Sequence, residues 1–412
     1  MTHDLAALLQ AVLDDPDDLA SRRVYGDALI GAGDPRGELI NTQCDLSVLP
    51  SSDPRWPGLL QRETELLAKH TKAWTAPFPF VFNPKFERGF IERVYVNTKK
   101  FVPAAAELFS REPITTLQMR ELTQASATTL GALPSLARLR ALRVTESKLG
   151  VKALQALISA RLTNLRSLGL YQAGIDDEGL AHLGDTVFPQ LERLDLSGTR
   201  VTYNGLEKLL RDPRLAKLGY LGAKWLFPAT DGTGFLAEHL DLPALTHLDL
   251  GSSHVDNADL RHLAANSTFQ KLRGLRLEHN ELDGAGAIAG LGPLSKLEVL
   301  DLSTNAFDVA AATELATWKQ PLRVLRLSMR HRRRSPGRAR EGRLPAEAPR
   351  SRVRRAQRAR HRSDRQHPLA PREARAVGDQ DRRRRCASPG QRELHRHAAR
   401  AIARLQQSHR RR

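Results

Sequence analysis

The sequence predicts an α/β solenoid that follows a small helical module and precedes a disordered, arginine-rich tail. Short leucine ladders recur about every 25 residues from residue 114 to residue 328, and almost all of the basic charge lies beyond them. A period in this range is typical of stacked strand–turn–helix units that share one core. We therefore divide the chain into four segments: residues 1–75, the helical module; 76–113, a strand-containing cap; 114–328, the repeats; and 329–412, the tail.

Three short helices are expected between residues 4 and 46. The first begins after Asp4, a favourable N-cap, and carries apolar residues at helical spacing. The second begins after Asp17 or Asp18 and stops at residues 31–33, where glycine tolerates the backbone of a helix end. The third opens at Asp34, which is followed by a proline suited to a first helical turn.

Several motifs of this region resemble the repeat-companion domain of large-genome bacteria. They are Asp15-Pro16-Asp17-Asp18, Val24-Tyr25-Gly26-Asp27, Gly33-Asp34-Pro35-Arg36-Gly37-Glu38 and Arg88-Gly89-Phe90-Ile91-Glu92. The resemblance covers roughly residues 4–122 and implies a module that precedes an array of repeats, with no established biochemical activity. Gly26 and Ala28 stand where the family prefers Ala and Trp, so a looser local core is expected.

Four charged residues of the module, Asp27, Asp34, Arg36 and Glu38, are open to two interpretations. They form either a functional cluster or ordinary surface structure, and we favour the second. In that interpretation Asp34 caps a helix while Arg36 and Glu38 pair across a surface turn. Further on, Gly89 is expected to mark a turn into a strand over residues 90–96, which would cap the first repeat.

The repeats can be aligned on a central leucine in each of nine rungs. These leucines are Leu117, Leu142, Leu168, Leu194, Leu218, Leu248, Leu275, Leu300 and Leu325. The pattern resembles leucine-rich repeats, and steps of 24 to 30 residues leave room for a helix, as in the ribonuclease-inhibitor type. The resemblance implies a right-handed horseshoe. Asn280 and Asn305 occupy a turn position where an amide can bond neighbouring backbone, and Ser147, Thr199 and Ser253 replace them elsewhere.

The longest step, from Leu218 to Leu248, contains an aromatic, glycine-rich stretch with Trp225, Phe227, Pro228 and Phe235. These aromatics either fill a gap in the core of an irregular repeat or stand on a protruding contact loop. We favour the core. If the array has a binding hot spot, this stretch is nevertheless the first candidate, because aromatic anchors dominate interfaces.

The side chains between the leucines are expected to form the concave surface and to contact a partner. The candidates are Arg120, Arg143, Tyr171, Asp195, Trp225, His247, Asp249, Arg276, Glu278 and Asp301, with Arg326 beside them. Charges alternate in sign, so the basic stripe with stacking aromatics that a nucleic-acid groove needs is absent from this surface. The three aspartates stand on separate rungs, which favours a common filler of the repeat over a metal or acid–base site.

The sequence lacks the common catalytic motifs, namely a nucleophile elbow, a Walker-type loop, a zincin helix and a cysteine–histidine pairing in context. The two cysteines, Cys44 and Cys386, form no metal-binding or disulfide pattern and fit a reducing compartment. There is neither a secretory signal nor a membrane-length apolar stretch. We expect a cytoplasmic bacterial protein that is not an enzyme and has no cofactor or metal.

The tail changes composition in the middle of a repeat. Residues 329–412 contain 28 arginines, no lysine and 7 acidic residues, a net charge of +21, whereas the rest of the chain sums to −3. All 21 aromatics lie before residue 329. Three interpretations remain: a disordered basic arm, an inert linker, or translation in a shifted reading frame. The abrupt change and the use of arginine without lysine favour the shifted frame.

The expected function is a protein–protein interaction scaffold that uses the concave face of the solenoid. One alternative is binding of nucleic acid or another acidic partner through the arginine-rich tail, with a steep salt dependence. Another is regulation of a GTPase, a role that the resemblance to ribonuclease-inhibitor-type repeats also implies. No residue of this sequence was matched to that role. The identity of the protein partner is not encoded in any motif.

Overall fold

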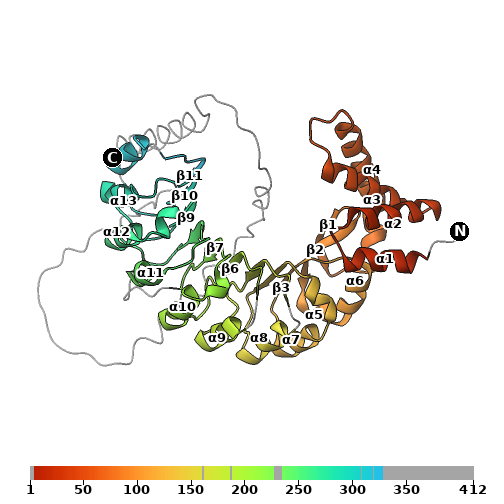
Figure 1. Ribbon diagram of the computed structural model, residues 1–412, viewed down its shortest axis with the longest axis horizontal. Coiled ribbons are helices and arrows are strands. Elements are labelled where there is room, and N and C mark those ends of the chain that lie inside the picture. Colours follow the sequence, from red (N-terminus) through yellow and green to blue (C-terminus); the bar gives the residue numbers. More distant parts are fainter. Residues whose placement is uncertain are drawn as a thin grey trace, which may run out of the picture. The chain divides into compact units, whose positions relative to one another are not determined.

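The computed structural model describes residues 4–159, 162–185, 188–226, 234–307, 309–318 and 320–327, all within one compact unit. The predictions for Phe227, Pro228, the side chain of Phe235 and the arginine-rich tail lie outside the described residues. A single sheet of 11 strands, ordered β1 to β11 as in the chain, organises the fold (Figure 1).

The sheet begins with an antiparallel hairpin, β1 (Val81–Glu87) and β2 (Phe90–Asn97), and continues with parallel strands only. The parallel strands are β3 (Thr116–Arg120), β4 (Ala141–Thr145), β5 (Ser167–Gly169), β6 (Arg193–Asp195), β7 (Tyr220–Gly222), β8 (His247–Asp249), β9 (Gly274–Arg276), β10 (Val299–Asp301) and β11 (Val324–Arg326). The expected strand after Gly89 is therefore present, and it pairs directly with the first repeat strand.

Helices connect successive repeat strands and pack along one face of the sheet (Figure 1). They are α7 (Gln124–Gly131), α8 (Val151–Ile158), α9 (Asp177–Asp185), α10 (Tyr203–Leu210), α11 (Gly234–His239), α12 (Asn257–Ala265), α13 (Gly284–Gly290) and α14 (Val309–Ala316). Between β2 and β3 lie α5 (Thr98–Phe101), a short 3₁₀ turn and α6 (Ala105–Arg111). Among the described residues, no helix has both the length and the apolar character needed to cross a bilayer.

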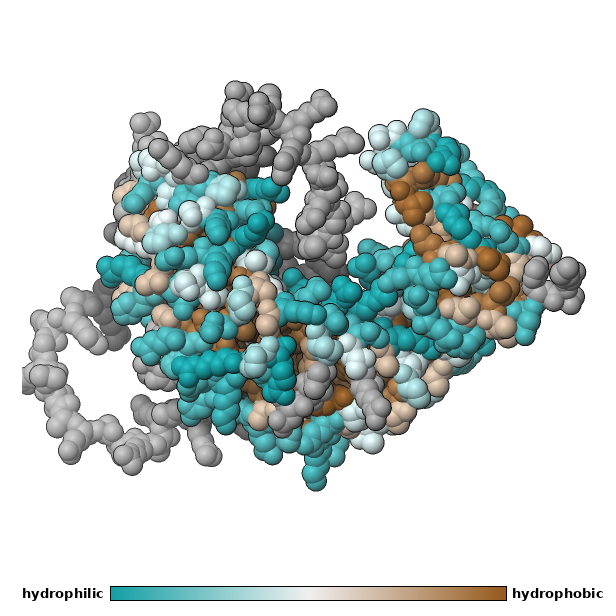
Figure 2. All heavy atoms as spheres, viewed as in Figure 1, coloured by the Kyte–Doolittle hydropathy of each residue, from teal (hydrophilic) through white to brown (hydrophobic). Residues whose placement is uncertain are grey.

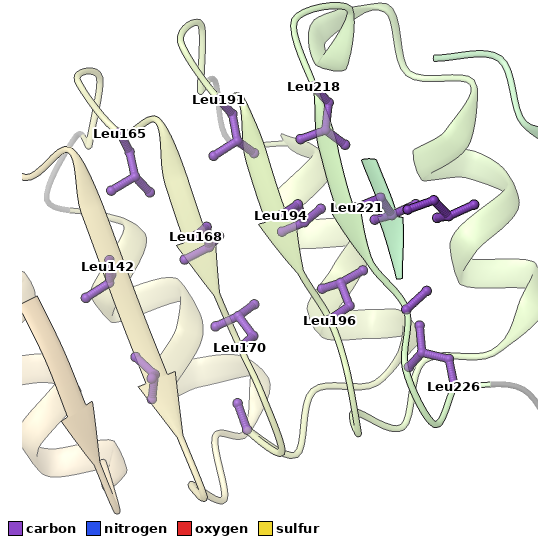
Figure 3. Close-up of a cluster of buried hydrophobic side chains, with 14 of the residues drawn as sticks. Leu142, Leu165, Leu168, Leu170, Leu191, Leu194, Leu196, Leu218, Leu221 and Leu226 are labelled. Atoms are coloured by element: carbon purple, nitrogen blue, oxygen red, sulfur yellow. The ribbon is translucent and has the colours of Figure 1, made fainter. Parts of the chain in front are cut away.

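Rows of leucines between the sheet and the helices form the core. In Figure 3, Leu168, Leu194 and Leu221 lie side by side on adjacent strands, and Leu218 lies in a separate row with Leu191. The prediction that Leu218 is a central leucine is therefore wrong, because Leu221 pairs with both Leu194 and Leu248. The expected steps of 24 and 30 residues on either side of this rung therefore become two steps of 27 residues.

A ladder of buried polar side chains ties the turns together. The Asn280 Oδ1 atom accepts hydrogen bonds from the amides of Ser253 and Val255, and its Nδ2 atom donates to the Leu250 carbonyl oxygen. Asn305 bonds the amide of Asn280 in the same way at 3.1 Å. These contacts confirm the expected role of the turn asparagines, which satisfy backbone groups that would otherwise be buried without partners.

The N-terminal module consists of α1 (Leu5–Asp14), α2 (Leu19–Gly31), α3 (Pro35–Val48) and α4 (Trp56–Thr75). The side chains of Asp4, Asp18 and Asp34 accept hydrogen bonds from first-turn amides, which confirms the expected helix caps. The looser core expected at Gly26 is not found. A Cβ atom at Gly26 would stand 2.8 Å from Asn41 Oδ1, so glycine instead allows α2 and α3 to approach closely.

Three module side chains hold the turn between β1 and β2, and we call Arg22, Arg36 and Gln43 the turn clasp. Arg22 Nη1 donates to the Arg88 carbonyl oxygen at 3.1 Å. Arg36 Nε donates to the Gly89 carbonyl oxygen at 3.0 Å, and the Gly89 amide donates to Gln43 Oε1 at 2.7 Å. The module therefore binds this hairpin largely through hydrogen bonds to hairpin backbone atoms.

The turn clasp also carries buried ion pairs. Arg22 lies 2.9 Å from Glu92, and Arg36 donates from Nη2 to both carboxylate oxygens of Glu112 at 2.7 Å. The prediction that Arg36 pairs with Glu38 is therefore wrong. Glu38 instead accepts hydrogen bonds from Arg62 at the surface. The preferred partner of Arg36 lies far along the chain, where local sequence gives no signal for it.

Candidate functional site

The face of strands β3–β11 opposite the helices holds the predicted contact residues, and we call it the open face. Because side chains alternate along a strand, residues flanking each central leucine point away from the helices. One register row on this face contains Arg143, Asp195, Asp249, Arg276 and Asp301. The remaining candidates stand beside that row: Arg120 and His247 on strands, and Tyr171, Trp225 and Glu278 just after strands.

Charged side chains on the open face neutralise one another. Arg120 lies 2.6 Å from Glu146, and Lys224 lies 2.8 Å from Glu278. The Arg143 guanidinium reaches Asp195, two strands away, at 3.3 Å. The alternating signs in the sequence are thus cross-strand ion pairs, and they leave the surface nearly neutral.

Glycine lets ion pairs form across an intervening rung. Lys224 and Glu278 meet above Gly251, where a Cβ atom would stand 2.5 Å from the nearer Glu278 oxygen. The other Glu278 carboxylate oxygen is buried and has no hydrogen-bond partner. A larger residue at position 251 would displace this carboxylate and separate the pair.

The three aspartates of this register row, Asp195, Asp249 and Asp301, make a structural hydrogen bond that the sequence did not reveal. Each accepts a hydrogen bond at 3.0 Å from the amide two residues later, which closes the end of its strand. An arginine lies beside each of them: Arg143 at 3.3 Å from Asp195, Arg276 at 3.6 Å from Asp249 and Arg326 at 3.7 Å from Asp301. Burial, followed by the charge of Glu278, raises the pKa of Asp249. Within the described ranges, no three acidic, histidine or cysteine side chains converge as metal ligands.

An aromatic pair occupies the centre of the open face. The ring centroids of Tyr171 and Trp225 are 6.0 Å apart at an interplanar angle of 41°, and the Lys224 ammonium lies 4.9 Å from the Trp225 ring. Trp225 is 45% exposed, so the favoured prediction that it fills the core is wrong. Its ring lies near Gly198, where a Cβ atom would stand 3.6 Å from Trp225 Cε3, an ordinary contact distance. We call Tyr171 and Trp225 the aromatic pair.

Trp225 occupies a turn position whose left-handed backbone recurs in other repeats. Its φ angle is +59°, and residues at the equivalent turn of other repeats, such as Gln172, Ser252 and His279, also have positive φ. A bulky residue in this left-handed region carries a steric cost that glycine would avoid. Trp225 therefore combines a costly backbone conformation with a ring that is 45% exposed.

The sequence alone did not predict two further residues of the open face, Arg193 and Tyr220, at the starts of β6 and β7. The Arg193 guanidinium lies 4.0 Å from the centroid of the Tyr220 ring, close enough for a cation–π interaction. Burial raises the pKa of Tyr220 to about 12, with a further contribution from the negative charges of Asp195 and Asp249. Alignment of this rung on Leu221 places Tyr220 beside His247 and would have revealed it. Burial and, secondarily, the charge of Arg193 lower the pKa of His247.

Comparisons with known proteins support the repeat assignment. Residues 189–210 match the leucine-rich repeat family, and a search of curated proteins finds no significant match. Among solved structures, a Bacteroides fragilis protein has 16% identity and a TM-score of 0.36, with 48% of this chain and 66% of that chain covered.

Two Listeria monocytogenes proteins are also similar in part. An internalin (inlF) has 20% identity and a TM-score of 0.33, with 52% of this chain and 61% of that chain covered. Internalin C2 has 18% identity and a TM-score of 0.28, with 58% and 81% covered. At these scores the superpositions are partial and carry no functional argument. The match at residues 189–210, together with the regular strand–helix units, shows that the chain contains leucine-rich repeats.

Proposed function

We propose that the protein is a non-enzymatic scaffold that binds a partner protein on the open face. The observation that carries this proposal is the aromatic pair, in which the half-buried Tyr171 packs against Trp225, whose ring is 45% exposed and whose backbone is left-handed. Tryptophan and tyrosine are the residues that most often anchor protein interfaces. Strain that contributes nothing to packing is commonly found at functional positions.

The surroundings of the aromatic pair support the same use. The centre of an interface tolerates few unpaired charges, because each one loses its hydration when a partner covers it. On the open face, Arg143 is paired with Asp195 and Lys224 with Glu278, so a partner would cover charges that already have partners. The strand-ending aspartates Asp195 and Asp249 likewise accept hydrogen bonds from backbone amides. The candidates Arg120, His247, Arg276 and Asp301 would then surround the central contact.

The test compares the full chain with Trp225→Ala in a quantitative affinity measurement against a captured partner protein. Loss of an aromatic anchor should weaken binding by at least about 2 kcal/mol, which is roughly thirtyfold. Phe82→Ala is the matched control, because Phe82 is also aromatic and 50% exposed but lies on the edge strand β1, six strands before β7, which Trp225 follows. Equal affinity of the parent and Trp225→Ala chains would refute this site.

A further inference from the structure

A groove in the N-terminal module is separate from the open face. We propose that it binds a peptide segment of a partner protein that presents an arginine or lysine side chain flanked by aliphatic residues. The groove is shallow and open to solvent, with a volume of about 580 Å³ between the start of α2, the end of α3, α4 and the end of β1. This volume can hold a few side chains of an extended segment.

The groove has aliphatic side chains along one wall. Leu19, Leu46 and Val48 line it, and Val48 is 56% exposed, the highest value among the large exposed hydrophobic residues of the described chain. Figure 2 shows hydrophobic surface over the N-terminal helices. An aliphatic wall of this kind covers the methylene stem of a lysine or arginine, whose charged end then extends beyond it.

An acidic group without a cationic partner completes the groove. Glu63 accepts a hydrogen bond from Gln43 Nε2 at 2.6 Å, and no lysine or arginine in the described part of the chain pairs with it. Gln43 is itself held by hydrogen bonds to the Phe86 carbonyl oxygen and from the Gly89 amide, so its own bond to Glu63 fixes the position of that carboxylate. A charge-assisted hydrogen bond from a guanidinium or ammonium group would use the remaining acceptor capacity.

The other charged side chains that line the groove are already paired. Asp17 contacts Arg140 and Arg88, Glu87 lies 3.0 Å from Arg93, and Arg88 lies 2.7 Å from Glu92, so Glu63 is the lining carboxylate left without a cationic partner in the described part of the chain. Residues 1–75 contain 7 basic and 12 acidic side chains, a net charge of −5. An anionic segment would be repelled, and a purely aliphatic one would leave Glu63 unpaired.

The experiment measures fluorescence anisotropy of the full chain with a labelled peptide, Gly-Leu-Arg-Leu-Arg-Leu-Gly, and with its counterpart containing glutamate in place of arginine. We expect binding of the arginine peptide alone. Glu63→Gln keeps an oxygen acceptor for Gln43 but removes the charge, and it should weaken binding about tenfold or more. Glu65→Gln is the matched control, since it removes the same charge from the same helix and lies outside the groove.

A second pair of variants tests the aliphatic wall without any change of charge. Val48→Ser should weaken binding, whereas Leu60→Ser, which alters an exposed aliphatic residue of α4 that does not line the groove, should not. Trp225→Ala should leave the peptide affinity unchanged. Three results would overturn the proposal: no binding of the arginine peptide, equal binding of the glutamate peptide, or equal loss in Glu63→Gln and Glu65→Gln.

Discussion

Arginine–carboxylate pairs occur in both the turn clasp and the open face, but in very different surroundings. The Arg36–Glu112 pair is almost inaccessible, with side-chain exposures of 16% and 1%, whereas the Arg120–Glu146 pair is 45% and 48% exposed. Removal of one partner from a buried pair leaves an uncompensated charge in the interior, while a surface pair loses only a screened attraction. The same chemistry therefore joins the module to the cap in one place and lies at the surface of the repeats in the other.

The largest effect is expected when the turn clasp is broken. Arg36→Met removes the bidentate partner of Glu112 and the hydrogen bond to Gly89, and it should reduce the free energy of unfolding by about 3–5 kcal/mol. Urea unfolding followed by circular dichroism measures this. Arg62→Met is the control, because it breaks a surface pair with Glu38 and should cost about 0.2–1 kcal/mol. Equal losses would contradict the distinction.

Gly89 is expected to be the next most sensitive position. Its φ angle is +86°, and a Cβ atom there would stand 2.7 Å from the Cα atom of Ile40. Gly89→Ala should therefore cost about 1–2 kcal/mol for the left-handed backbone and a further 1–3 kcal/mol for overpacking. Gly33→Ala has a similar φ angle of +77° but open space around it, so it should show the backbone cost alone. The two variants are compared by thermal unfolding.

A smaller, pH-dependent effect is expected at Asp17, which pairs with Arg140 and Arg88 at the junction of module and array. The hydrogen bond from Arg140 is the main reason why the pKa of Asp17 lies below its ordinary value of 3.8. The unfolded chain then binds the proton more tightly, so the stabilisation is present above that value and is lost as the pH falls through the folded-state pKa. Asp17→Asn should be less stable than the parent at pH 7, and the difference should shrink as the pH falls below 3.8. A difference independent of pH would show that charge is not its origin.

The smallest effect is expected on the open face itself. Arg120→Met breaks the exposed pair with Glu146 and should change the free energy of unfolding by about 0.2–1 kcal/mol, less at high salt. Chemical unfolding at low and high ionic strength measures both quantities. A loss as large as that of Arg36→Met would place the open-face pairs among the structural contacts.

The features predicted correctly from the sequence are those set by neighbouring residues in the chain. The aspartate caps at Asp4, Asp18 and Asp34 and the glycine turn at Gly89 depend on neighbouring residues, and the structure confirms each of them. The partner of Arg36 is Glu112, 76 residues away, and such pairing is decided by tertiary packing.

The repeat alignment failed for a related reason. Leucines three residues apart give two possible registers, and the rung with Leu218 and Leu221 has glycine at position 222, where neighbouring rungs have Asp195 and Asp249. The strand-ending aspartate that would have chosen the register is therefore absent from this rung. The same shift concealed Tyr220 and made the stretch around Trp225 look like an irregular insertion.

The most direct test of the central claim is the stability of Trp225→Gly. If Trp225 serves recognition, glycine relieves the left-handed backbone by about 1–2 kcal/mol and offsets the loss of a half-exposed ring, so the free energy of unfolding should change by less than about 1 kcal/mol. A loss of about 3–5 kcal/mol, the usual cost of removing a large aromatic from a core, would show that Trp225 is a packing residue and that the open face lacks the proposed anchor.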